Sequence, residues 1–224
     1  MSGRLYVVAT PIGNIKDITI RALDVLREVD LILCEDTRRT RQLLSHYGIS
    51  NELLSYNEHN ERERIPLVLS YLKEGKEIAL VSDAGTPGIS DPGYRLVREA
   101  RIKGFEVLSV PGPSAIIAAL SVSGLPTDRF VFEGFLPRRK GKRLKRLEFL
   151  KNEDRTIIIY ESVHRIERTL QEILEVIGDR EIAVCRELTK VFEEVKYGKL
   201  STIINEGITK KGEFVIVLRG KDES

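Results

Sequence analysis

The chain has 224 residues, of which 42% are hydrophobic, and its 36 Lys and Arg residues nearly balance its 34 Asp and Glu residues. This size and composition are typical of a soluble globular protein with one large or two small domains. The sequence contains no run near the roughly 20 apolar residues that span a bilayer and no signal-peptide pattern, so we predict a cytoplasmic protein without a membrane partner.

The first half of the chain alternates apolar, strand-like runs with amphipathic, helix-like segments. The predicted strands span residues 5–9, 31–34, 78–81 and 105–110, and the predicted helices span residues 20–28, 38–47, 62–73, 93–103 and 113–121. Asp91 is expected to cap the fourth of these helices, with Pro92 as its first residue. The alternation predicts an α/β domain with a mostly parallel sheet over residues 1–122.

A break in composition at residues 123–127, Ser-Gly-Leu-Pro-Thr, marks the predicted domain boundary. We expect residues 123–224 to form a second α/β domain with a mixed sheet. Its predicted strands span residues 130–133, 156–160, 182–185, 191–197 and 214–219. One predicted helix follows a basic loop and ends near residue 151, and two more span residues 163–177 and 201–206. The strands at 182–185 and 191–197 are predicted to form a hairpin.

The two cysteines, Cys34 and Cys185, each end an apolar run. We expect buried free thiols rather than a disulfide. Because no cysteine pair has the spacing of metal ligands and the three histidines are scattered, no metal site is predicted.

The loop over residues 82–93, Ser-Asp-Ala-Gly-Thr-Pro-Gly-Ile-Ser-Asp-Pro-Gly, is the strongest functional signal in the sequence. It follows a predicted strand and offers little side-chain bulk, so a ligand would meet its main chain. Glycines allow close approach and prolines restrict the loop, which favours a preorganised site at the carboxyl edge of a parallel sheet. A tight connection with no ligand is the alternative, but this loop exceeds the usual 2 to 6 residues or so.

Two more loops of small residues follow predicted strands, at residues 10–14 and 110–115. Three such loops are expected to converge on one edge of the sheet. The first loop lacks the spaced glycines of a dinucleotide fingerprint, and the sequence has no Gly-Lys-Ser/Thr phosphate loop. A ligand site without a phosphate cradle indicates a nucleoside-like cofactor.

Together these segments resemble the tetrapyrrole-methylase superfamily, and in particular its members that methylate small-subunit ribosomal RNA. The resemblance runs from about residue 4 to residue 219, in order and spacing, and is carried by LYVVATPIGN (5–14), CEDTR (34–38), SDAGTPGISDPG (82–93), VPGPSA (110–115), FEGFLP (132–137), YES (160–162) and RELTK (186–190). It implies two α/β domains with S-adenosylmethionine in the cleft between them. It also implies methylation of the ribose 2′-hydroxyl of a cytidine in the decoding region of 16S rRNA, by a homodimer.

The same resemblance implies which residues contact S-adenosylmethionine. They are Pro11, Gly13, Ala84, Gly85, Thr86, Ile89, Ser114, Ala115, Glu161 and Leu188. Where many relatives have Gly-Gly-Asp, this chain has Ala84-Gly85-Thr86 and therefore lacks a carboxylate, for which the neighbouring Asp83 is the candidate replacement.

Three residues are candidates for a general base that would assist a weakly acidic ribose hydroxyl. Asp36 follows the second strand beside Arg38, and its alternative role is to cap the following helix. Asp83 and Lys190 are weaker candidates.

Residues 137–146 hold seven Lys or Arg residues and no acid, which predicts a mobile cationic arm for RNA phosphates. The alternative is a solvated charged helix face. The candidate RNA-binding residues are Arg138, Arg139, Lys140, Lys142 and Arg143, with Arg38, Arg39 and Arg41 as an extension of the patch and His59 as a contact for an unstacked base. The expected partner is 16S rRNA or the small ribosomal subunit.

Two other functions stay open from the sequence. A precorrin methylase or a diphthine synthase would share the fold and the cofactor but would not require a basic arm. A non-catalytic ribosome-binding factor would use the arm alone, and the loops would then be simple connections.

Overall fold

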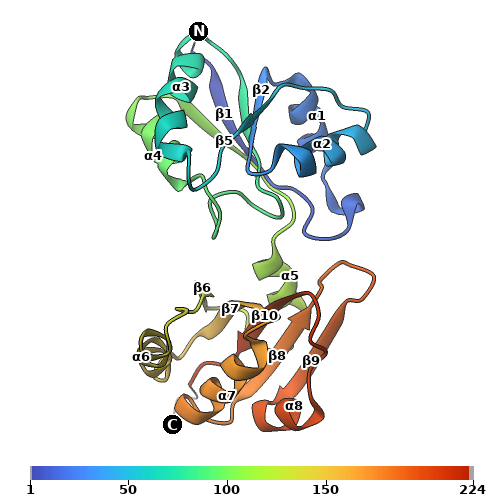
Figure 1. Ribbon diagram of the computed structural model, residues 1–224, viewed down its shortest axis with the longest axis vertical. Coiled ribbons are helices and arrows are strands. Elements are labelled where there is room, and N and C mark those ends of the chain that lie inside the picture. Colours follow the sequence, from blue (N-terminus) through green and yellow to red (C-terminus); the bar gives the residue numbers. More distant parts are fainter. Residues whose placement is uncertain (1, 222–224) are drawn as a thin grey trace. The chain divides into compact units, whose positions relative to one another are not determined.

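The computed structural model describes residues 2–221 of the chain (Figure 1). The chain divides into two compact units, Met1–Ser114 and Ala115–Ser224, each built on its own sheet. The predicted fold class of two α/β domains is confirmed.

The N-terminal unit is an open sheet of parallel strands in the order β3-β2-β4-β1-β5. Its elements are β1 (Arg4–Val8), the 3-10 helix η1 (Ile15–Asp17), α1 (Ile20–Glu28), β2 (Leu31–Cys34), α2 (Thr37–His46), β3 (Leu53–Ser55), α3 (Glu61–Lys73), β4 (Ile78–Leu80), α4 (Tyr94–Ile102) and β5 (Glu106–Val110). Helices α1 and α2 cover one face through Leu26 and Leu44, and α3 and α4 cover the other through Leu72 and Leu96 (Figure 1). Because both faces are covered, β2 and β4 are buried along their whole length.

The strand order places the carboxyl ends of β4, β1 and β5 next to one another. The chain that leaves β1 continues to α1 on one face of the sheet, whereas the chain that leaves the neighbouring β4 continues to α4 on the opposite face. This arrangement is a topological switch point, the place where open α/β sheets bind ligands. The N-terminal unit therefore has the topology that a ligand site at this edge requires.

Two local expectations for this unit were wrong. Strand β3 was not predicted, because its three residues become a strand only by pairing with β2. Helix α4 begins at Tyr94 with Gly93 at the N-cap, where φ is 144°, so Asp91 and Pro92 lie before the helix. Among the residues that the structure describes, no side chain caps α4 through a hydrogen bond.

The C-terminal unit has a mixed sheet in the order β6-β7-β10-β8-β9, in which β6 and β7 pair in parallel and the other neighbours pair antiparallel. Its elements are α5 (Ala115–Val122), β6 (Phe130–Phe135), α6 (Lys140–Leu150), β7 (Thr156–Ser162), α7 (Ile166–Val176), β8 (Glu181–Arg186), β9 (Glu194–Lys199), α8 (Leu200–Glu206) and β10 (Glu213–Leu218). Helices α6, α7 and α8 pack on one face, through residues such as Leu147, Leu170 and Ile203. The predicted hairpin of β8 and β9 is present.

Helix α5 belongs to the C-terminal unit, so the division between the units falls at Ser114 and Ala115 rather than at the predicted residues 122 and 123. The helix packs against β10, and the Cys185 thiol of β8 lies 4.0 Å from the carbonyl oxygen of Ala119. This contact lies on the face of the sheet opposite α6, α7 and α8, because side chains alternate between faces along a strand.

Cys34 and Cys185 are buried free thiols, as predicted. Within residues 2–221, no cluster of ligating side chains suitable for a metal ion is present. In the same residues, no helix combines the length and the apolar character needed to cross a membrane.

A buried ion pair anchors the basic segment, which consists of the loop before α6 and the first turns of that helix. Arg143 is fully buried and donates from Nε and Nη2 to the two carboxylate oxygens of Glu172 on α7, at 2.5 and 2.8 Å. Its Nη1 donates to the carbonyl oxygens of Pro137 and Arg138, at 3.1 and 2.8 Å. The expected RNA-binding role of Arg143 is therefore corrected to a structural one, because its guanidinium is spent on protein acceptors. The segment is a fixed loop and helix instead of a mobile arm.

We expect Arg143→Met to destabilise the protein by about 3 to 5 kcal/mol, because it leaves the Glu172 carboxylate buried without its partner. Urea unfolding measures the change, with the exposed neighbour substitution Lys142→Met as the matched control. Combining Arg143→Met with Glu172→Leu should recover most of the loss. A single variant within about 1 kcal/mol of the wild type would contradict the anchoring role.

Candidate functional site

The three small-residue loops of the N-terminal unit meet at the carboxyl edge of its sheet, as predicted. The main chains of Thr10 and Gly85 exchange two hydrogen bonds, of 2.9 and 3.0 Å. The Thr10 hydroxyl donates to the Ser82 carbonyl oxygen at 3.0 Å, and the Thr86 hydroxyl donates to the Pro113 carbonyl oxygen at 3.2 Å. The loops that follow β1 and β5 are thus both tied directly to the loop that follows β4.

Gly85 sits where the three loops touch. Its φ is +88°, a conformation that favours glycine, and a Cβ at this position would lie 3.4 Å from Ile12 and 3.9 Å from the Pro113 carbonyl oxygen. Among the predicted cofactor residues of the N-terminal unit, Gly13, Ala84 and Ile89 are exposed, and Pro11, Thr86 and Ser114 are half-buried. Ala115, also half-buried, is the first residue of the C-terminal unit. The predicted cofactor residues of this unit therefore cluster and present main chain and small side chains, while their role in binding stays a prediction.

Asp36 caps helix α2. Its carboxylate accepts a hydrogen bond from the main-chain N–H of Arg38 at 2.8 Å and pairs with the Arg38 guanidinium at 2.8 Å. The Arg38 guanidinium holds the pKa of the Asp36 carboxyl well below its usual range. A carboxylate with a lowered pKa is a weak base, so the geometry favours capping over the catalytic role.

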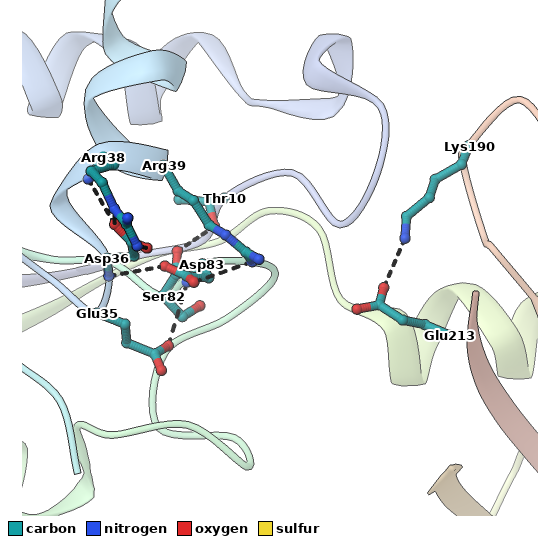
Figure 2. Close-up of polar contacts among 9 residues, drawn as sticks. All are labelled: Thr10, Glu35, Asp36, Arg38, Arg39, Ser82, Asp83, Lys190 and Glu213. Carbon is teal, nitrogen blue, oxygen red and sulfur yellow. Dashed lines mark hydrogen bonds and ion pairs between the residues drawn. The ribbon is translucent and has the colours of Figure 1, made fainter. Parts of the chain in front are cut away.

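Asp83 joins the loop after β4 to the start of α2. Figure 2 shows its carboxylate between the main-chain N–H of Asp36, at 3.2 Å, and the Arg39 guanidinium, at 3.3 Å. Glu35 in turn accepts a hydrogen bond from the main-chain N–H of Asp83 at 3.4 Å. Both carboxylates therefore serve as links between neighbouring loops.

Asp91 and Glu35 are acids that the sequence analysis did not count among the site residues. Burial and then the charge of Glu35 raise the pKa of Asp91 to about 7, and burial raises the pKa of Glu35. Glu35 comes directly after β2, and Asp91 lies in the loop after β4. These positions in the sequence are the signal that could have placed both acids at the same edge of the sheet.

The loop after β8 holds Leu188 in a constrained turn. The flanking residues Glu187 and Thr189 have φ values of 50° and 66°, which are uncommon for residues other than glycine. Lys190 Nζ lies 2.8 Å from both Glu187 and Glu213, the second of which Figure 2 shows. Although burial opposes it, the hydrogen bonds to these two carboxylates raise the pKa of Lys190, so it is a poor proton acceptor.

The Glu161 carboxylate is fully used inside the C-terminal unit. It accepts hydrogen bonds from the Ser162 main chain, from the Arg165 guanidinium and from the Thr169 hydroxyl, at 2.7 to 2.8 Å. The Glu161 side chain is buried and its carboxylate is bonded to donors of its own unit, while its predicted contact with the cofactor stays a prediction.

The other cations of the predicted RNA-binding set are exposed. Arg146, the next arginine along α6, forms a bidentate pair with Glu133 at 2.7 Å and is part of the scaffold. The exposed members are Arg38, Arg39, Arg41, His59, Arg138, Arg139, Lys140 and Lys142. Arg38 and Arg39 remain accessible despite their ion pairs, with 86% and 70% of their side chains exposed.

We expect Asp91→Asn to stabilise the protein by about 1 to 2 kcal/mol at pH 8, a value discounted because solvent screens this partly exposed group. The pKa of Asp91 is raised in the folded state, so the ionised carboxyl costs stability progressively as the pH rises from about 4 to about 7. Urea unfolding at pH 8 and pH 4 checks the sign, because the gain should vanish at pH 4. The exposed Asp128→Asn is the control, and an equal gain at both pH values would contradict the prediction.

The sequence model of the protein family Tetrapyrrole (Corrin/Porphyrin) Methylases matches residues 4–204 of the chain. A protein named Ribosomal RNA small subunit methyltransferase I from Thermotoga maritima is 55% identical over 222 residues, which cover 98% of this chain and 100% of that protein. A protein of the same name from Escherichia coli O157:H7 is 49% identical over 223 residues, which cover 97% of this chain and 78% of that protein.

Solved structures share the fold. A diphthine synthase superposes with a TM-score of 0.71 at 16% identity, covering 97% of this chain and 90% of its own. A uroporphyrin-III C-methyl transferase from Thermus thermophilus, complexed with S-adenyl homocysteine, superposes with a TM-score of 0.68 at 20% identity, covering 97% of both chains. The chain therefore belongs to the tetrapyrrole (corrin/porphyrin) methylase family, and within it to the group that contains the ribosomal RNA small subunit methyltransferase I proteins.

Proposed function

We propose that the protein is an S-adenosylmethionine-dependent methyltransferase that methylates the ribose 2′-hydroxyl of a cytidine in 16S rRNA, in the decoding region of the small ribosomal subunit. Identities of 55% and 49% to proteins named ribosomal RNA small subunit methyltransferase I support the rRNA substrate. The observation that carries the proposal is the convergence of the loops after β1, β4 and β5 at the switch point of the sheet.

The residues at this edge fit S-adenosylmethionine. The loops over residues 10–14 and 82–93 contain no Lys or Arg and no aromatic side chain, so they offer main-chain groups, hydroxyls and small apolar walls instead of a phosphate cradle. When bound, the cofactor would supply the methyl group carried on its sulfonium sulfur. The proposed contacts are Pro11, Gly13, Ala84, Gly85, Thr86, Ile89, Ser114, Ala115 and Leu188.

We infer that alignment contributes more to the reaction than a strong side-chain base. The Asp36 carboxylate caps its own helix, and the Asp83 carboxylate holds Arg39. The ammonium group of Lys190 is paired with two carboxylates. The tied loops would instead hold the hydroxyl and the methyl carbon in line, where effective molarities are large.

The exposed cations on the C-terminal unit support an RNA substrate. Arg138, Arg139, Lys140 and Lys142 stand on a segment that Arg143 fixes in place, and Lys or Arg side chains on such a segment bind phosphates. A precorrin or diphthine substrate would not require them. We further propose that the enzyme acts in the cytoplasm. We also propose that it is a homodimer, and analytical ultracentrifugation tests this oligomeric state.

The proposal is tested by methyl transfer from labelled S-adenosylmethionine to small-subunit particles, naked rRNA and a tetrapyrrole. We expect transfer to the particles or the rRNA, at a cytidine 2′-oxygen located by resistance to alkaline cleavage. Transfer to the tetrapyrrole alone would assign a small-molecule methylase. Absence of cofactor binding at about millimolar concentration, measured by calorimetry, would leave a non-catalytic ribosome-binding factor.

We expect Gly85→Ala to weaken cofactor binding roughly tenfold or more, because it strains a left-handed residue at the junction of the loops that we propose to hold the cofactor. Gly104→Ala is the matched control, since its φ of +79° is similar and the space around its Cβ is open. Calorimetry with S-adenosylmethionine compares the two variants. Equal affinities in both would place the cofactor away from this junction.

We expect Asp36→Asn to keep turnover within about threefold of the wild type, because Asn caps a helix about as well as Asp but cannot act as a base. Asp36→Ala should lower the stability of the protein through loss of the cap. Turnover and cofactor affinity are measured in parallel. A loss of about 100-fold in turnover for the Asn variant, with unchanged cofactor affinity, would restore Asp36 as the catalytic base.

A further inference from the structure

A basic groove lies on the C-terminal unit beside the start of helix α7. It has a volume of about 520 Å³, and its lining includes His164, Arg168, Lys210 and Lys211. These residues were not among the predicted RNA-binding residues. The groove therefore adds a feature that the proposed reaction does not yet use.

The charges of the groove leave it cationic. Lys210 pairs with Glu167 at 2.8 Å, and both side chains are more than half exposed. Arg168 lies 3.7 Å from Glu172, whose carboxylate already holds the buried Arg143. With Lys211 added, three cations face one accessible carboxylate, which favours an anionic ligand.

An exposed aromatic ring stands at the groove. Phe192 is 63% exposed, and Lys211 Nζ, which belongs to the groove, lies 5.9 Å from the centre of its ring. Phe192 belongs to the connection between β8 and β9. Figure 1 shows the course of that connection. A large apolar side chain left in water next to a cationic groove is a surface on which a flat ring can stack.

The connection that carries Phe192 is fixed by its own hydrogen bonds. The main-chain N–H of Lys190 donates to the Glu187 carbonyl oxygen at 3.0 Å, and the N–H of Glu193 donates to the Lys190 carbonyl oxygen at 3.1 Å. The Glu193 carboxylate accepts from the main-chain N–H of Thr189. Because this turn is already ordered, a ligand would not lose binding energy in ordering it.

One cation of the groove acts on the same carboxylate as the basic segment of α6. The pKa of the Glu172 carboxyl is lowered by Arg143 and further by the charges of Arg168 and Lys140. Cations from the first turns of α6 and α7 therefore surround one carboxylate.

We propose that this surface, the Phe192 groove, defined by His164, Arg168, Phe192, Lys210 and Lys211, binds an unpaired nucleotide of the RNA substrate. The base stacks on the Phe192 ring, and the flanking phosphates pair with Arg168, Lys210 and Lys211. The proposal rests on the proposed rRNA substrate and extends its footprint on the C-terminal unit. A protein partner would bury the ring but would not require three cations beside it, so the charges favour RNA.

Fluorescence anisotropy with a labelled, unstructured RNA of about ten nucleotides tests the proposal, with the full chain at several salt concentrations. Neutralising the groove with Arg168→Gln, Lys210→Gln and Lys211→Gln should weaken binding roughly tenfold and lower the salt slope by about 2. Phe192→Leu should weaken binding roughly tenfold without changing the salt slope, and Phe192→Tyr should restore it. The matched control, Arg129→Gln with Lys199→Gln and Lys221→Gln, removes the same charge outside the groove and should bind like the wild type.

Wild-type affinity and salt slope in both the neutralised and the Phe192→Leu variants would overturn the proposal. A shift of Phe192→Leu from dimer to monomer in ultracentrifugation, with unchanged RNA affinity, would also overturn it and assign the ring to a second copy of the chain. Methyl transfer by the wild type is measured separately. Loss of RNA binding in the variants, together with a wild type that transfers no methyl group, would support the groove and reject the proposed function. An active wild type, together with variants that bind RNA normally, would support the proposed function and reject the groove.

Discussion

The parallel pairing of β1 between β4 and β5 is the constraint on which the candidate site depends. Parallel strands end at one edge of the sheet, so the loops that follow these three strands must meet there. The paired hydrogen bonds between Thr10 and Gly85 then lock two of the loops together, and the Thr86 hydroxyl adds the third. Because strand ends position the loops, small residues suffice to make a rigid surface, and large side chains are not needed to shape it.

The acidic side chains at the same edge act mainly as fasteners between loops. Asp83 accepts a hydrogen bond from the main chain of Asp36, and Asp36 caps the helix that follows β2. The carboxylates that look most suited to catalysis are thus committed to architecture. Removing a charge here would change the loop geometry together with any chemistry, which is why an Asn substitution that preserves the cap separates the two roles better than Ala.

Features that depend on local sequence could be predicted, and those that depend on distant partners could not. The helix over residues 20–28 and the strand over residues 31–34 have the bounds that the apolar pattern indicated. Arg143 was misassigned because a run of cations was taken as surface, although Arg143, Leu147 and Leu150 share one face of α6 and two of them are leucines of the core. Its partner Glu172 is on another helix, so no local pattern showed the pair. Strand β3 and the position of α5 likewise depend on partners far along the chain.

On helix α6 of the C-terminal unit, two arginines pair with carboxylates of the protein, whereas two lysines are exposed to solvent. Arg143 and Arg146 on α6 face inward or along the sheet and make bidentate pairs with Glu172 and Glu133, which suits the planar guanidinium. Lys140 and Lys142 on the same helix are exposed, and a flexible ammonium can follow a phosphate whose position varies. The arginine pairs keep the helix in place while the lysines remain in water. If RNA is the substrate, as we propose, a protein surface ordered in this way leaves most of the entropy cost of binding to the RNA strand, which favours a substrate segment that is already splayed out by the particle around it.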